Sequence, residues 1–162
     1  MAAFAYEGVA RELIARAKYH GRHAALGWLA DRMVEAWVGA GADMPDVVTW
    51  APTAPARRRA RGVDHARLLA RRVARRLGVR AVPVLTRGDG PAQTDRAVAD
   101  RRAGPAVAAR RPVAGRVLLV DDVATTGATL RVCAAALRGA GATGVVALTA
   151  ARTPPGRAHR RG

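Results

Sequence analysis

The sequence predicts an α/β protein in which helices flank an open parallel sheet and an N-terminal helical cap completes the fold. Two observations support this class: short β-branched runs alternate along the chain with segments whose apolar residues recur at helical spacing. The 162 residues are enough for one domain with a buried core. We expect a cap or hood over residues 1–45, a core over 46–152 and a basic, disordered tail over 153–162.

The cap is predicted from two amphipathic segments. Between Phe4 and Tyr19, apolar residues recur at helical intervals, and Gly21 would end this first helix. A second helix is expected from His23 to Val38, followed by the breaker sequence GAGADMP. Both helices would form a cap on the core rather than a domain of their own.

Four apolar, β-branched runs predict the strands of the core. They are Asp46–Pro52, Arg80–Arg87, Arg116–Val123 and Gly144–Arg152. One helix is expected within Ala56–Gly78 and another within Thr125–Ala142. Residues 88–112 have no clear period, which predicts a long functional or mobile loop. This order of strands and helices implies a parallel sheet with helices on its faces.

Composition narrows the classes of function. The net charge is +16, and all but one of the 28 basic residues are arginines. Such a surplus attracts nucleic acid or phosphorylated small molecules, although abundant Arg, Ala and Gly also indicate GC-rich coding. Aromatic residues make up only 4%, so the sequence has few platforms for stacking single-stranded nucleic acid.

Neither a bilayer-spanning apolar run nor the apolar core of a secretory signal is evident, so we expect a cytoplasmic protein without a membrane partner. Cys133 is the single cysteine, which excludes an internal disulfide. We interpret it as a small apolar residue on the buried face of a helix.

The stretch RVLLVDDVATTGATLRVCAAAL, Arg116–Leu137, carries the strongest functional signal. Its four successive apolar residues predict a central strand buried on both faces, with Asp121 and Asp122 at the carboxyl end. Open α/β sheets bind their ligands at that edge. The small and hydroxylated residues Thr125–Thr129 then lead into a helix, and backbone N–H groups at such a turn bind phosphate.

The acids and the phosphate-binding turn are reconciled by a sugar phosphate. Carboxylates accept hydrogen bonds from the vicinal hydroxyls of a ribose, while the turn holds the 5′-phosphate. Mg²⁺ would offset the remaining negative charge through oxygen ligands and water. The alternative is that the two acids cap a turn and that Thr-Thr-Gly only begins a helix. The contiguous order of strand, acids, turn and helix favours the ligand site.

VLLVDDVATTGATL, Val117–Leu130, resembles the phosphoribosyl pyrophosphate signature of the type I phosphoribosyltransferases. The resemblance implies that Asp121 and Asp122 bind the ribose hydroxyls. It also implies a loop around the 5′-phosphate, formed by Ala124, Thr125, Thr126, Gly127, Ala128 and Thr129.

Within that superfamily, residues 6–152 are similar to the ComF family of competence-associated, amidophosphoribosyltransferase-like proteins. The similarity lies in YEGVARELIARAKYHGR, RGVDHARLLAR and PAQTDRAVADRR. The chain departs from that family at Val63–His65, where Phe-Asn-Gln is usual, and at the segment TWAPTAP.

The family match implies catalytic roles for Arg61, Gln93 and Arg101, the last two within the family's mobile-loop segment. Arg87 could close over the site together with that loop. We interpret His65 as a structural residue rather than a general base.

Pyrophosphate contacts are expected from the turn after the first core strand, at Ala51 and Thr53, and from the guanidinium of Arg58. Transfer of a phosphoribosyl group develops positive charge on the sugar and negative charge on the leaving pyrophosphate. Positioning and fixed charges can catalyse this step, so no covalent nucleophile is required.

Three functions remain open at this point. The chain could transfer the phosphoribosyl group of phosphoribosyl pyrophosphate to an unknown acceptor. It could instead be a non-catalytic protein of DNA uptake that senses a ribose 5-phosphate ligand and contacts DNA or a helicase through its arginines, with a homodimer possible. A plain nucleic-acid-binding module is the third class, and the acid pair argues against it because it would repel a polyanion.

Overall fold

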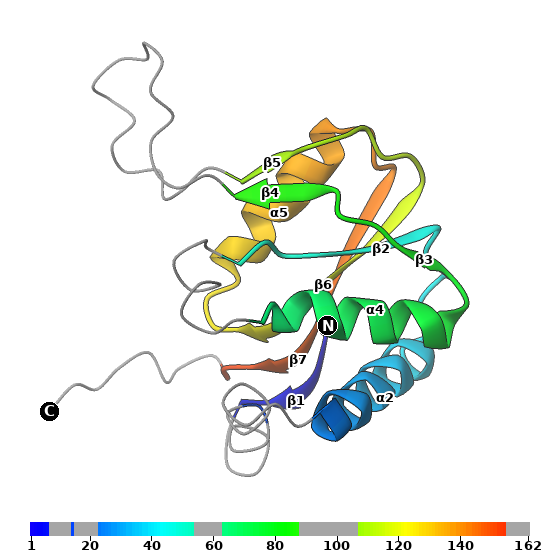
Figure 1. Ribbon diagram of the computed structural model, residues 1–162, viewed down its shortest axis with the longest axis vertical. Helices are drawn as coiled ribbons and strands as arrows, with labels where there is room; N and C mark the ends of the chain where they lie inside the picture. The colour runs from blue at the N-terminus through cyan, green and yellow to red at the C-terminus, as the bar shows by residue number, and fades with distance from the viewer. Residues whose placement is uncertain (7–13, 15–22, 54–62, 88–106, 155–162) are drawn as a thin grey trace, which may run out of the picture.

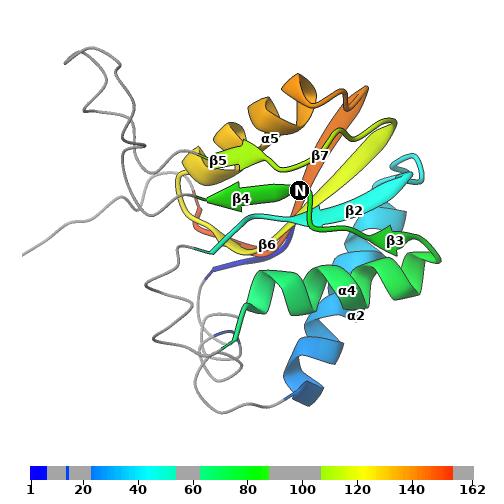
Figure 2. The same ribbon diagram turned by 45° about the horizontal axis from the view of Figure 1, so that its top comes forward.

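The computed structural model describes residues 1–6, 14, 23–53, 63–87 and 107–154 (Figure 1). Helices lie on both faces of a sheet, as the two views of the ribbon show (Figures 1 and 2). This arrangement confirms the predicted α/β class, a parallel sheet flanked by helices.

The main sheet has five strands in the order β1-β7-β6-β2-β3. They are β1 (Ala2–Ala5), β7 (Gly144–Arg152), β6 (Arg116–Ala124), β2 (Val47–Trp50) and β3 (Arg80–Ala81). All four neighbouring pairs are parallel. The carboxyl ends of the strands therefore meet at one edge of the sheet, where the sequence predicts the ligand site.

Two helices cover one face of the sheet and a third covers the other. Helix α2 (His23–Gly39) and helix α4 (His65–Leu77) pack against each other and against β6, β2 and β7. Helix α5 (Ala128–Gly139) packs against β6 and β7 on the opposite face (Figures 1 and 2). None of the helices within the described ranges is long and apolar enough to cross a membrane.

The direction of chain progress reverses between β2 and β6. From β2 the chain passes through α4 to β3, and from β6 it passes through α5 to β7 on the other side. The two crossovers run away from each other, so their helices lie on opposite faces. Such a reversal leaves a crevice between the two central strands, which is the usual binding site in this architecture.

Side chains of the central strands alternate between two cores. Leu118, Val120 and Leu148 are fully buried on the side of α2 and α4. Val117 and Leu119 are buried on the other side, against Cys133 and Leu137 of α5. Burial on both faces explains the uninterrupted apolar run of β6, as predicted.

The N-terminus corrects the predicted first helix, because residues from Phe4 onward were expected to be helical and Ala2–Ala5 form β1 instead. Ala2 pairs with Thr149 and Phe4 with Ala151, so β1 completes the edge of the sheet beside β7. Backbone pairing with a distant strand outweighs local helical spacing here. Of the rest of that predicted helix, the structure describes only Tyr6, which follows β1 in a bend, and Ile14, which is helical and buried.

The predicted strand over residues 80–87 is also corrected, since it forms two short strands in different sheets. Arg80–Ala81 is β3 of the main sheet, whereas β4 (Leu85–Arg87) pairs antiparallel with β5 (Val107–Ala109). Pro83 lies at the break, and its missing N–H group prevents it from continuing a ladder. β5 replaces part of the predicted loop over 88–112, and residues 88–106 lie outside the described ranges.

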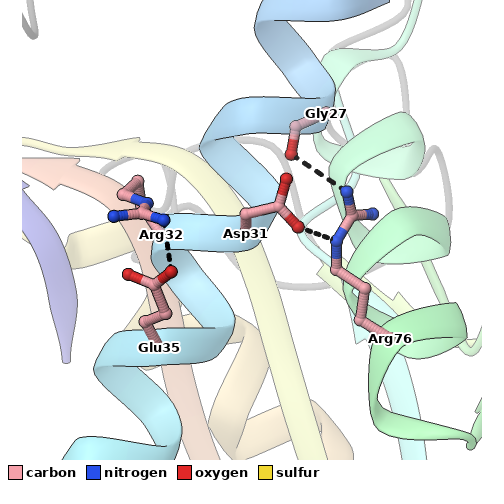
Figure 3. A network of polar contacts seen from close by, with 5 residues as sticks. All are labelled: Gly27, Asp31, Arg32, Glu35 and Arg76. Atoms are coloured by element: carbon pink, nitrogen blue, oxygen red, sulfur yellow. Dashed lines mark hydrogen bonds and ion pairs between the residues drawn. The ribbon is translucent and has the colours of Figure 1, made fainter.

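A polar clamp joins α2 to α4 on the outer surface (Figure 3). The guanidinium of Arg76 donates to the carboxylate of Asp31 through Nε and to the carbonyl of Gly27 through Nη2, the latter at 3.4 Å. The hydrogen bond from Arg76 is the main reason that the pKa of Asp31 lies below its ordinary value of 3.8. On α2 itself, Arg32 pairs with Glu35 one turn later.

Candidate functional site

A cavity of about 320 Å³ opens where β2 and β6 end. It lies at the reversal point of the sheet, between the crossover through α4 and the crossover through α5. Six of the predicted binding residues line it: Ala51, Thr53, Asp121, Asp122, Thr125 and Thr129. The structure therefore brings residues predicted to bind the sugar, the 5′-phosphate and the pyrophosphate to one cavity.

The paired acids are half-buried and belong to the last part of β6. β2 ends opposite Val120, and the N–H of Ala51 donates to the Val120 carbonyl at 3.0 Å. β6 continues beyond this point, so the strand edge carrying Asp121 and Asp122 borders the cavity instead of another strand on that side. The early end of β2 thus exposes the two acids to a ligand.

Short hydrogen bonds fix the backbone around both carboxylates. Oδ1 of Asp121 accepts the N–H of Asp122 at 2.8 Å, and Oδ1 of Asp122 accepts the N–H of Val123 at 2.7 Å. These bonds hold each carboxyl group close to its own strand. A rigid pair of acceptors at the end of a buried strand suits recognition of two neighbouring hydroxyl groups.

The turn from β6 into α5 forms the predicted phosphate-binding segment. Gly127 has a φ of 71°, which side-chain-bearing residues rarely adopt, and α5 begins at the next residue. Oγ1 of Thr126 accepts the N–H of Ala128 at 3.3 Å, and Arg131 donates to the Thr126 carbonyl at 3.0 Å. Thr125 faces the cavity, so the turn presents hydroxyl and amide donors at the positive end of a helix.

The predicted residues of this turn have different surroundings. Ala124 is buried beneath the turn, while Thr126 and Ala128 are exposed. Thr129 is the first-turn residue of α5 that lines the cavity.

The turn after β2 is tied to the start of α4. Thr53 donates through Oγ1 to Oδ1 of Asp64 at 3.3 Å, and the same oxygen accepts the N–H of Arg67 at 3.1 Å. Asp64 is therefore the N-cap of α4. Asp64 is one of the departures from the ComF pattern, and in this chain its side chain couples the predicted pyrophosphate turn to a helix.

Several cavity residues were not predicted as binding residues. His65 is buried at the first position of α4 and lines the cavity with Val63 and Ala66. Tyr6 lies just after β1, and its N–H donates to the carbonyl of Arg152 at 2.8 Å. Tyr6 was missed because its segment was predicted to be helical. Had β1 been predicted as a strand, the position of Tyr6 directly after it would have indicated the ligand-binding edge of the sheet.

Cys133 of α5 is fully buried in the core between that helix and the sheet, as predicted. Burial raises the pKa of its thiol to about 12, the negative charge of Asp121 adds to this rise, and the positive charge of Arg87 opposes it. A thiol with this pKa is protonated at neutral pH and behaves as an apolar core residue.

The remaining predicted residues lie outside the described ranges. They are Arg58, Arg61, Gln93 and Arg101. Their proposed roles stay predictions that rest on the family resemblance and on the chemistry of arginine.

The donor set at the cavity fits magnesium in one particular way. Within the described ranges, no group of three or more His, Cys, Asp or Glu side chains gathers to hold a metal ion. Mg²⁺ commonly takes one or two protein carboxylates and completes its shell with water and substrate phosphate oxygens. Asp121 and Asp122 meet that requirement, so the residues fit an ion held jointly with a phosphorylated ligand.

The fold and the cavity define an α/β protein whose sheet has, at its reversal point, a cavity lined by two carboxylates and by the turn that leads into α5. Residues 64–162 match the phosphoribosyl transferase domain family. The chain therefore belongs to that family, which confirms the superfamily predicted from the acid pair and the turn. No curated protein matches the chain in sequence.

Solved structures with the same fold include enzymes of several specificities. Glutamine phosphoribosylpyrophosphate amidotransferase from B. subtilis, complexed with ADP and GMP, matches 87% of this chain at 23% identity and a TM-score of 0.57. This match covers 30% of the amidotransferase, so the chain spans about a third of that enzyme's length.

Two shorter enzymes match over most of their own length. Adenine phosphoribosyltransferase from Thermoanaerobacter pseudethanolicus has 19% identity and a TM-score of 0.53, covering 82% of each chain. Orotate phosphoribosyltransferase from Aeropyrum pernix has 21% identity and a TM-score of 0.50, covering 88% of this chain and 80% of its own. At these identities the likeness shows the fold.

Proposed function

We propose that the protein binds phosphoribosyl pyrophosphate in the cavity and transfers its phosphoribosyl group to an acceptor. One observation carries the proposal: Asp121 and Asp122 line the same cavity as Thr125 and Thr129. A diol-binding pair and a phosphate-binding turn within one cavity match a ribose 5-phosphate. Membership of the phosphoribosyl transferase domain family supports the same assignment.

Each part of the donor has a set of residues suited to it. The ribose hydroxyls would donate to Asp121 and Asp122, and the 5′-phosphate would accept from the turn Ala124–Thr129 at the start of α5. The pyrophosphate would accept N–H groups from the turn at Ala51 and Thr53, beside the capped start of α4.

The chemistry follows from this placement. Cleavage of the bond from ribose to pyrophosphate leaves positive charge on the sugar, which the two carboxylates stabilise because they lie beside it. Bound Mg²⁺ would supply positive charge to the pyrophosphate. Arg58, Arg61, Gln93 and Arg101 are proposed to bind the leaving group and exclude water, on the strength of the family resemblance.

A second candidate function rests on the exposed side of α4. Arg67, Arg71 and Arg75 are exposed and four residues apart, so they follow one line along the helix. None of the three forms an ion pair with another described residue, whereas Arg76 pairs with Asp31. A ComF-like protein that senses the ligand without turnover and contacts DNA through this line is therefore the alternative.

Calorimetry with phosphoribosyl pyrophosphate and Mg²⁺ tests the donor site. We expect the double variant Asp121→Asn and Asp122→Asn to bind at least about tenfold more weakly, since charge-assisted hydrogen bonds are lost. Asp46→Asn, at the opposite end of the sheet, is the matched control and should bind like wild type. Unchanged affinity in the double variant would refute the assignment.

Release of pyrophosphate over a panel of nitrogenous bases and amines then separates the two candidates. Release with one acceptor supports transfer, whereas tight binding without release across the panel supports a sensor. DNA binding that falls steeply with salt and is unaffected by Asp121→Asn would favour the arginine line of α4 as a separate surface.

A further inference from the structure

Among the described residues that line the cavity, Arg87 is the one arginine or lysine. The same lining contains the carboxylates of Asp121 and Asp122. A cavity with two carboxylates would repel the phosphates of the proposed donor unless a cation faces them. Arg87 is placed to supply that cation, since it lines the same cavity.

The side chain of Arg87 contains an unsatisfied donor. Its Nε is buried, and within the described part of the chain this N–H has no hydrogen-bond acceptor. A buried donor without a partner is unfavourable, so such groups in folded proteins usually meet a ligand, an ion or water. The cavity is also lined by hydroxyl and N–H donors that suit a phosphate, so an anionic oxygen of the ligand is a suitable acceptor for this N–H.

The antiparallel pair of β4 and β5, here called the hairpin, attaches Arg87 to the main sheet. Arg87 is the last residue of β4 and pairs with Val107 of β5. At the base of the hairpin, the N–H of Val84 donates to Oγ1 of the buried Thr49 at 3.4 Å, and its carbonyl accepts the N–H of Arg110 at 2.8 Å. The backbone of Arg87 is thus held by strands rather than by a loop.

We propose that Arg87 binds a phosphate group of the ligand from the α5 side of the cavity that it lines together with the two acids. This inference rests on the proposed donor site. The group bound is either the pyrophosphate, held also by the turn at Ala51, or the 5′-phosphate, held also by the turn at Thr125. Both present the oxygens that a guanidinium recognises with two parallel hydrogen bonds.

The test compares Arg87→Ala, Arg87→Gln and Arg87→Lys by calorimetry with phosphoribosyl pyrophosphate, ribose 5-phosphate and inorganic pyrophosphate, each with Mg²⁺. We expect Arg87→Ala and Arg87→Gln to bind phosphoribosyl pyrophosphate at least about tenfold more weakly, and Arg87→Lys to recover part of the loss. Arg110→Ala is the matched control, because this exposed arginine lies just after β5 and outside the lining.

The two smaller ligands identify the group that is bound. A loss confined to inorganic pyrophosphate assigns Arg87 to the leaving group, and a loss confined to ribose 5-phosphate assigns it to the 5′-phosphate. Wild-type affinity for all three ligands in Arg87→Gln, with an unchanged melting temperature, would overturn the proposal. Failure of the wild type to bind any of them would instead refute the donor site itself.

Discussion

At the amino end of the sheet, Asp46 accepts the N–H of Arg116 at 2.7 Å, and its carboxylate lies 3.9 Å from Nε of the same arginine. At the carboxyl end, Asp121 and Asp122 accept N–H groups of their own strand and line the cavity. Asp46 directly precedes β2, and Asp121 and Asp122 belong to the last part of its neighbour β6. Their partners differ: Asp46 joins one strand to the next, whereas Asp121 and Asp122 face the space between them.

Steric contacts show the same contrast. Gly115 precedes β6 with a φ of 80°, and a Cβ added there would lie 2.5 Å from Oδ2 of Asp46. Its carbonyl accepts the N–H of Thr143 at 2.9 Å, which fixes the turn to the segment that precedes β7. The amino end is thus closely packed around its acid, while the carboxyl end retains a cavity around its acids.

The largest loss of stability is expected from adding a side-chain atom at the closely packed amino end of the sheet. Gly115→Ala should lower the free energy of unfolding by about 2–3 kcal/mol, because the backbone is left-handed there and the new Cβ displaces Asp46. Urea denaturation measures this loss.

The control for that substitution is Gly139→Ala at the end of α5, where a Cβ meets no atom within 4 Å. Its free energy of unfolding should stay within about 0.5 kcal/mol of wild type. Equal losses in the two variants would mean that the amino end has no special packing constraint.

A smaller effect should distinguish the acids themselves. Asp46→Asn should cost about 0.5–1 kcal/mol of stability, because its exposed ion pair with Arg116 is lost although an amide oxygen can still accept the Arg116 N–H, and should leave ligand affinity unchanged. Asp122→Asn should show the reverse, with weaker binding of phosphoribosyl pyrophosphate and little change in stability, since an amide oxygen can still accept the Val123 N–H. Denaturation and calorimetry on both variants check the exchange, and parallel losses in both measurements would break the contrast.

The smallest effect concerns Asp31, which lies away from both ends of the sheet and gives a baseline for an exposed acid. Its folded pKa is lowered, so the stabilisation by Arg76 is present above the ordinary value of 3.8 and is lost as the pH falls through the folded value. Asp31→Asn should therefore be slightly less stable than wild type at pH 7 and match it in strong acid. A stability difference that grows on acidification would contradict this sign.

The central part of the fold could be predicted because its strands and helices have clear local sequence patterns. β2, β6 and β7 are apolar runs bounded by turns, and α4 and α5 have apolar residues at helical spacing with Gly78 and Gly139 at their ends. β1 could not be predicted, because its conformation depends on pairing with residues almost 150 positions away. Pro83 could have indicated the division between β3 and β4, since proline does not continue a sheet ladder.

The candidate site could be predicted where chemistry is contiguous in the sequence. Asp121, Asp122 and the turn at Thr125 form one motif, and the structure brings them to one cavity. Tyr6 and His65 come to that cavity only through the topology, from β1 and from the start of α4. The spacing of residues along the chain does not show that these two residues meet, so they could be assigned to the cavity only once the fold was known.

The pairing of β1 with β7 also bears on how the protein is made. Ala2 aligns with Thr149, so β1 leaves the ribosome well over a hundred residues before the strand that it pairs with. At a synthesis rate of about 5–20 residues per second, β1 waits roughly 7 to 30 seconds for its partner. Helix α2 packs on α4 as well as on β7, so only the part of α2 that faces β7 waits in the same way. Until β7 emerges, Phe4 and that part of α2 are nascent-chain surface that a chaperone can bind.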